Sequence, residues 1–452
     1  MKYMFFYCSV TYLNLKNYIT KEVSNMKNMF SSLRYLTSLD VSSFDTSLVT
    51  DMSYMFSDIT LITSLDLSNF DTSNVITMQG MFYRCSYLEN VNVKSFDTSK
   101  VTDISYMFGA CSAIENIDLS NFETNRVNKM NCLFINSYNI KWIDISSFTT
   151  ENVNEIQAMF EGCNSLTSID LSKFKTHNVV NMYAMFHECY SLENLKFNFI
   201  TNKVTNMGMM FNDCYLLKSL DVTSFNTTLV DSMSSIFENC YSLESLDLSN
   251  FKTDNLFEME NMFTNCSSLK YLDISNFNTI NFYSMFDLFR DCRSLTSLDL
   301  SSFKTDNVYT MSNMFKNCES LKRLVLKHFN TEKVSSISNM FNNCNSLEEL
   351  DISNFVTSKI TDMSNLFYNC KSLTSLNIKN FNTEKVINMD GMFYSCSSLE
   401  FLDLSSFNTN NCLSFQNTFY GCNKLSILVN PNNCIDMILE LPEYVKYENI
   451  TN

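Results

Sequence analysis

The stretch LITSLDLSNFDTSNVITMQGMF, residues 61–82, decides the fold, because the chain repeats it almost from end to end. The copy before it, LTSLDVSSFDTSLVTDMSYMF, covers residues 36–56. The Phe in the middle of each copy marks the register, and it recurs every 26 residues except for one interval of 25, between Phe174 and Phe199. A fixed internal period of this length predicts a solenoid, in which similar units stack and bury a shared core.

Each copy contains two apolar patterns. Leu39 and Val41 alternate with polar residues such as Asp40, which predicts a strand with one buried and one exposed face. Farther along, Met52 and Met55 follow the three-residue spacing of a short helix or a 3-10 segment. The copies therefore predict an α/β repeat solenoid, with a parallel sheet on one face and short helical or 3-10 segments on the other.

The same register divides the chain into three parts. Residues 1–17 are expected to be a partial repeat without a capping segment, and residues 18–425 to be a solenoid of about sixteen 26-residue repeats. The pattern then stops, and residues 426–452 contain both prolines, Pro431 and Pro442. This last part is expected to be a C-terminal cap or tail.

Composition narrows the class of protein. Hydrophobic residues make up 45% of the 452 residues, which is too many for a disordered chain. No run of 18 apolar residues occurs, so no membrane span is expected. The formal net charge of −16 disfavours nucleic acids and anionic membrane surfaces as partners.

The repeat resembles a known family. Its unit, Leu-x-x-Leu-Asp-Leu-Ser-x-Phe-x-Thr-x-x-Val-x-x-Met-x-x-Met-Phe-x-x-Cys, is similar to that of the BspA-like leucine-rich repeat proteins, over about residues 4–425. The resemblance implies that the solenoid is leucine-rich-repeat-like. It also implies surface display, adhesion and binding of other proteins or of host or cell-surface macromolecules. The first residues lack the small-residue cleavage site of a signal peptide, so a cytoplasmic location is the alternative.

One column of acidic residues is the candidate binding site. By alternation these residues face solvent from the predicted sheet. They are Asp40, Asp66, Asp118, Asp144, Asp170, Asp221, Asp247, Asp273, Asp299, Asp351 and Asp403. We call this column the acidic ladder. It is interpreted either as a hydrated ladder whose charges are compensated locally or as an acidic surface for a partner. Calcium is disfavoured, because it needs six to eight oxygens from flexible loops.

Two other columns have structural interpretations. A Thr column runs without a gap from Thr20 to Thr409, and its hydroxyls are expected to bond the backbone where the strand turns. A Cys column runs from Cys85 to Cys422 and is interpreted as buried thiols. The chain contains no Cys-x-x-Cys zinc motif, so no metal or other cofactor is expected.

Catalytic motifs are not recognisable. The three histidines, His177, His187 and His328, form no spacing typical of a nucleophile and its base. The sequence therefore favours a non-enzymatic adhesion or protein-binding solenoid that uses the acidic ladder. The alternative is an intracellular structural scaffold whose repeats serve as a spacer or docking surface.

Overall fold

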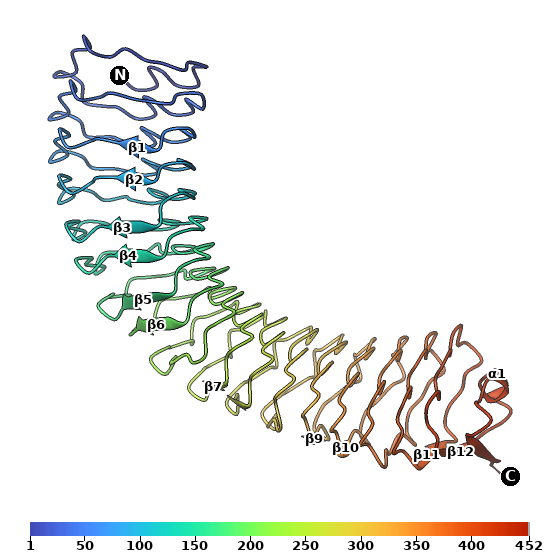
Figure 1. Cartoon of the computed structure of the whole chain (residues 1–452). Helices are drawn as coiled ribbons and strands as arrows, with labels where there is room; N and C mark the ends of the chain where they lie inside the picture. The colour runs from blue at the N-terminus through green and yellow to red at the C-terminus, as the bar shows by residue number, and fades with distance from the viewer. Residues whose placement is uncertain (451–452) are drawn as a thin grey trace. The chain divides into compact units, whose positions relative to one another are not determined.

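The computed structural model describes residues 1–450. Its contacts divide the chain into two units, Met1–Leu217 and Lys218–Asn452, and within each unit successive coils stack on one another (Figure 1). Strands of neighbouring coils are parallel, and Ser64 pairs with Asn90, the residue 26 positions later. The predicted solenoid with parallel strands is confirmed.

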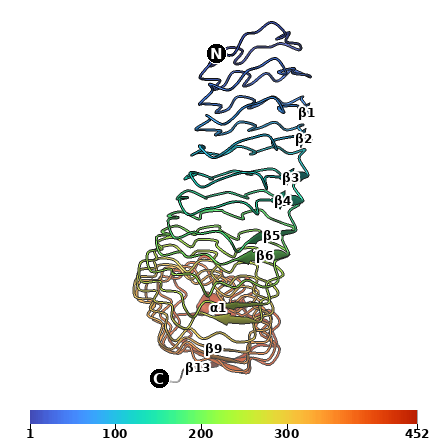
Figure 2. The same ribbon diagram turned by 90° about the vertical axis from the view of Figure 1, so that its left-hand side faces the viewer.

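The strands of the first unit lie along one edge of its stack (Figure 2). They pair as β1 with β2, β3 with β4, and β5 with β6. Their bounds are β1 (Ser64–Leu65), β2 (Asn90–Val91), β3 (Asn116–Asp118), β4 (Trp142–Asp144), β5 (Ser168–Leu171) and β6 (Asn194–Phe197). Each strand is short because the coil turns again after a few residues.

The second unit repeats this arrangement and ends differently. Parallel pairing joins β7 with β8, β9 with β10, and β11 with β12, which in turn pairs with β13. The bounds are β7 (Ser245–Asp247), β8 (Tyr271–Asp273), β9 (Arg323–Val325), β10 (Glu349–Asp351), β11 (Phe401–Leu404), β12 (Ser426–Val429), α1 (Ile435–Leu439) and β13 (Lys446–Asn449). Residues 426–450 thus extend the sheet by two strands and place α1 between them.

The other side of each coil differs from the helical or 3-10 segment expected there. Within residues 1–450 the one α-helix is α1, outside the repeats. In the repeats, single parallel bridges such as Asp51 to Thr77 are followed by consecutive turns. Residues with positive φ recur in these turns, for example Asn313 at 58° and Asn317 at 63°. A left-handed residue cannot continue a right-handed helix, so the three-residue spacing comes from turns closed by bonds between residues i and i+3.

Stacked Phe rings fill the core. In the first unit the rings from Phe5 to Phe211 follow one another at centroid distances of 5.5–6.0 Å and interplanar angles of 4–15°. The second unit has the same arrangement from Phe237 to Phe419. A shift of one residue would remove every ring from its neighbour, so this stack fixes the 26-residue register.

The Thr column joins the coils at the corner after the strand. Every member from Thr20 to Thr409 is buried. The hydroxyl of Thr72 donates to the carbonyl of Asp97 at 2.9 Å and accepts from the N–H of the same residue at 2.8 Å. The predicted backbone bonding at this corner is confirmed, and it links each coil to the next one.

The Cys column is buried, as predicted, and its thiols also make hydrogen bonds. Cys292 Sγ donates to the carbonyl of Phe263 at 3.2 Å. At the same place in another coil, Ser137 Oγ donates to the carbonyl of Phe108 at 2.7 Å. Burial raises the pKa of Cys85 to about 12, which keeps that thiol protonated and able to donate. All cysteines of the described residues are free thiols.

Across residues 1–450, the structure contains no helix that is both long enough and apolar enough to cross a lipid bilayer.

Candidate functional site: the outer face of the sheet

The acidic ladder lies on the outer side of the sheet. Seven of its members lie in strands, and Asp40, Asp66, Asp221 and Asp299 occupy the same register position in coils where no strand includes that residue. Its members are exposed or half-buried, whereas the apolar residues next to them, such as Leu67 and Leu248, are buried. The first unit contains Asp40, Asp66, Asp118, Asp144 and Asp170, and the second contains Asp221, Asp247, Asp273, Asp299, Asp351 and Asp403.

Each ladder carboxylate also has a local structural task. In all eleven cases one carboxylate oxygen accepts a hydrogen bond from the N–H two residues later, at 2.9–3.2 Å. Asn92 makes the same bond to Lys94 where the ladder has an amide. The Asp side chain therefore closes the turn that ends the strand, which an Asn side chain also does.

Strand register brings some of these charges together. Asp118 is directly opposite Asp144, and Asp247 is opposite Asp273. Such pairs of like charges destabilise a sheet unless neighbouring groups compensate them. The hydroxyl and the N–H of Ser120, with the ammonium of Lys94, hold the pKa of Asp118 below its ordinary value.

Basic residues interrupt the ladder and limit its negative field. Lys196 occupies the ladder position on β6 and is directly opposite Asp170. Arg323 and Glu349, from neighbouring strands, form an ion pair of 3.1 Å. The outer face is therefore a mixed charged surface with acidic stretches, on which opposite charges on adjacent strands stabilise the pairing.

Aromatic side chains form a second feature of the outer face. Trp142, Tyr271 and Phe401 each lie two residues before a ladder Asp and are 50%, 55% and 51% exposed. The alternation of the strand places them on the same side as the carboxylates. Rings so exposed contribute little to the core, so they are available to contact another molecule.

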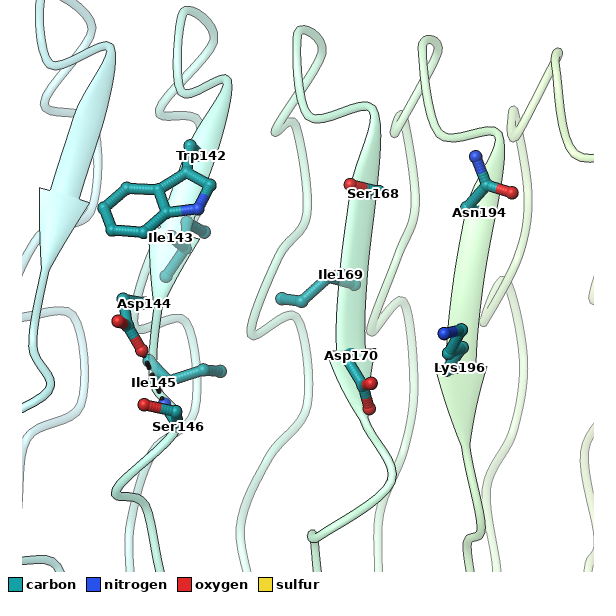
Figure 3. Close-up of a pocket in the computed structure, with 10 residues that line it drawn as sticks. All are labelled: Trp142, Ile143, Asp144, Ile145, Ser146, Ser168, Ile169, Asp170, Asn194 and Lys196. Atoms are coloured by element: carbon teal, nitrogen blue, oxygen red, sulfur yellow. Dashed lines mark hydrogen bonds between the residues drawn. The ribbon is translucent and has the colours of Figure 1, made fainter.

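Trp142 borders a concavity of about 580 Å³ on the outer face of the first unit (Figure 3). Within residues 1–450, β3 pairs with β4 and β5 pairs with β6, but β4 does not pair with β5. The concavity lies at this interruption. Its lining is Trp142, Ile143, Asp144, Ile145, Ser146, Ser168, Ile169, Asp170, Asn194 and Lys196. We call it the Trp142 groove. It combines one large ring with carboxylate, amide, hydroxyl and ammonium groups.

Sequence reasoning identified the ladder but missed the Trp142 groove. A usable signal was present, because Trp142 is the one tryptophan of the chain and alternation places it on the outer face. The interruption of pairing between β4 and β5 has no such signal. The strand segments at 142–144 and 168–171 follow the same pattern as their neighbours.

Solved structures of leucine-rich repeat proteins are similar to this chain. A leucine-rich cell surface protein from Faecalibacterium prausnitzii is 16% identical, with 83% of this chain and 77% of that chain covered and a TM-score of 0.33. The plant peptide hormone receptor RGFR1, in complex with RGF2, is 14% identical, with coverages of 92% and 70% and a TM-score of 0.25. The functional domain of InlJ from Listeria monocytogenes, which includes a cysteine ladder, is 15% identical, with coverages of 93% and 71% and a TM-score of 0.20.

No curated protein matches the chain. Five overlapping segments do match a family described as "Mycoplasma protein of unknown function, DUF285". They are residues 1–118, 110–218, 167–269, 232–349 and 336–434. Because these segments span most of the sequence, the chain belongs to the DUF285 family, and the resemblance to BspA-like leucine-rich repeat proteins is confirmed.

Proposed function

We propose that this chain is a non-enzymatic protein-binding solenoid that is displayed at a cell surface and binds its partner through the outer face of the sheet. The observation that carries this proposal is the exposed ring of Trp142 beside a groove lined by charged and polar groups. Surface display follows from the resemblance to the BspA-like proteins.

The groove has the composition of a binding site for a protein. Tryptophan is among the residues that dominate binding energy when an interface buries them. Asp144, Asp170 and Lys196 surround the ring with groups that hydrogen-bond and pair with charges, which favours one orientation of the partner. The strands on which these groups lie are held by the stacked core, so little ordering of the site is needed on binding.

The acidic ladder contributes to recognition by attracting basic groups of the partner. Asp247, Asp273 and Asp299 form an uninterrupted acidic stretch over three successive coils of the second unit. Replacing all three with Asn keeps the turn-closing acceptor, as the bond of Asn92 shows, and removes the charge. We expect weaker binding at low salt and a smaller salt dependence. Unchanged affinity and unchanged salt dependence would remove the ladder from the binding site.

The groove itself is tested with Trp142→Ala and a matched control. The control variant is Ile76→Ala. Ile76 is 49% exposed and lies in the same unit, but it is on the side of the coil with the single bridges and not on the outer face of the sheet. A panel of purified extracellular proteins is screened with the wild-type chain by biolayer interferometry, and each partner found is measured again with both variants. Trp142→Ala is expected to weaken binding by about 30-fold, which corresponds to a hot spot of about 2 kcal/mol.

Ile76→Ala should leave the affinity unchanged. If Trp142→Ala binds as tightly as the wild-type chain, the groove is not the binding site. Surface display is tested separately, by protease treatment of intact cells that produce the chain. Degradation of the chain without cell lysis is expected, and full protection would favour the intracellular scaffold.

A further inference from the structure

A second cluster of polar groups lies away from the outer face, among the turns of the first unit. His187 and Glu188 belong to one coil, and Asp213 belongs to the next. The N–H of Glu188 donates to the carbonyl of Asn212 at 3.0 Å, which fixes the two coils against each other at this point. One ligand atom from each of His187, Glu188 and Asp213 lies within 4.8 Å of the other two, and all three residues are half-buried.

The distances in this cluster are unusual for direct hydrogen bonds. His187 Nε2 is 3.8 Å from Glu188 Oε1, and His187 Nδ1 is 3.9 Å from Asp213 Oδ2. Hydrogen bonds between such groups are about 2.7–3.2 Å long. His187 Nδ1 is buried and has no hydrogen-bond partner. The imidazole and the carboxylates therefore approach one another without bonding directly.

Other coils show how carboxylates in these turns are otherwise compensated. Asp58, in the same column as Glu188 and Asp213, is 2.6 Å from the guanidinium of Arg34. Asp291, in the same column of the second unit, pairs with Arg293 at 2.8 Å. In the cluster, the basic side chain beside the carboxylates is a histidine, a residue type that also binds metal ions.

Two carboxylates, from Glu188 and Asp213, lie beside one imidazole in this cluster. A divalent cation would stabilise such an arrangement.

We propose that His187, Glu188 and Asp213 bind a Zn²⁺ ion that joins two neighbouring coils. Zinc accepts histidine nitrogen and carboxylate oxygen at about 2.0–2.2 Å. In tetrahedral geometry, two such ligand atoms are about 3.4 Å apart. An imidazole binds a given ion through one of its nitrogens. Nδ1 of His187, which has no hydrogen-bond partner, lies 3.9 Å from Asp213 Oδ2, close to that spacing. Glu188 Oε1 approaches the other nitrogen, Nε2, so binding through Nδ1 requires a rotation of the Glu188 side chain. Water completes the four ligands. A nitrogen ligand disfavours calcium, which takes oxygen ligands.

The test is zinc titration of the purified full chain after treatment with a chelator. Isothermal titration calorimetry is expected to show one strong site for ZnCl₂ in the wild-type chain. His187→Ala should weaken that site at least tenfold and remove the thermal stabilisation that zinc gives. His177→Ala is the matched control, because His177 is exposed and lies one residue after Thr176 in a corner turn. This variant should bind zinc as the wild-type chain does.

Co²⁺ provides a second readout that does not depend on affinity. In the wild-type chain it should give the intense visible absorption of a tetrahedral ion, and Asp213→Asn should reduce that band while circular dichroism stays unchanged. The proposal is overturned if the wild-type chain binds no zinc. It is also overturned if His187→Ala and His177→Ala bind zinc equally, because the buried thiols or another group would then hold the ion.

Discussion

Replacing Thr305 with Val isolates the hydrogen bonds that join successive coils. Thr305 is 1% exposed. Its hydroxyl donates to the carbonyl of Asn330 at 2.9 Å and accepts from the N–H of Asn330 at 2.7 Å. Valine has nearly the same shape but lacks the hydroxyl, so the core packing stays the same while both backbone groups of Asn330 lose their partner.

The size of the effect follows from those two groups. A buried backbone donor or acceptor without a partner costs about 1–3 kcal/mol. Asn330 is half-buried, so water compensates part of this loss. We expect Thr305→Val to lower the free energy of unfolding by about 2–3 kcal/mol, as the sum of two partly compensated groups.

Urea unfolding followed by circular dichroism measures this difference. Hydrogen exchange adds a local readout, since the amide of Asn330 should exchange faster in Thr305→Val. Thr305→Ser is the control: it keeps the hydroxyl, and the loss of a methyl group costs less than about 1 kcal/mol. Equal stabilities of the Val and Ser variants would refute the assignment of the Thr column to coil joining.

Three further predictions test the core, the thiols and the ladder. Phe315→Ala should lower the free energy of unfolding, measured in urea, by about 3–5 kcal/mol. Phe401→Ala removes an exposed ring and should change this free energy by less than about 0.5 kcal/mol. Similar losses in the two variants would contradict the stacked core. Cys292→Ala should lower the free energy of unfolding by about 1–3 kcal/mol. Cys292→Ser should lower it by less, because the serine hydroxyl can still donate to the carbonyl of Phe263. A Ser variant less stable than the Ala variant would contradict the thiol hydrogen bond. The pKa of Asp118 is lowered, chiefly by Ser120, so its contribution to stability is complete above the ordinary pKa of 3.8 and is lost as the pH falls through the lower pKa of the folded state. Asp118→Asn should therefore make unfolding less dependent on pH below about pH 5, and an unaltered pH dependence would show that this carboxylate is not stabilised in the folded chain.

Much of the fold could be predicted from the sequence because the repeat restricts every copy in the same way. The 26-residue period placed the Phe rings, the Thr hydroxyls and the thiols in columns, and the structure has them there. The strand face followed from the alternation around Asp40. These features depend on side-chain polarity and period, both of which are visible in one sequence.

The turn side was not predictable in the same way. Apolar spacing of three residues fits a helix and also fits consecutive turns with i to i+3 bonds. The deciding information lies in residues that tolerate positive φ, and Asn313 and Asn317 are two of them. Asn pairs four residues apart in several copies could have indicated turns. Residues such as Tyr54 and Met209, however, adopt positive φ without any preference for it.

The candidate sites depend on local departures from the repeat, and these were harder to foresee. The Trp142 groove forms where two adjacent strands do not pair, and His187 meets Asp213 because one coil places its turn over the next. A periodic pattern describes what the copies share. Binding surfaces arise where single copies differ, and one sequence alone gives no distances between such residues.

The stability of two deletion variants tests the stacking of 26-residue coils most directly. Removing residues 304–329 takes out one complete period and joins Phe303 to Asn330, which restores the register of every column. Removing residues 304–316 takes out half a period and places strand against turn. Both variants are unfolded in urea and followed by circular dichroism. The 26-residue deletion should keep a cooperative transition and the wild-type spectrum per residue. The 13-residue deletion should lose the cooperative transition and the wild-type spectrum. Equal behaviour of the two variants would contradict the stacked register.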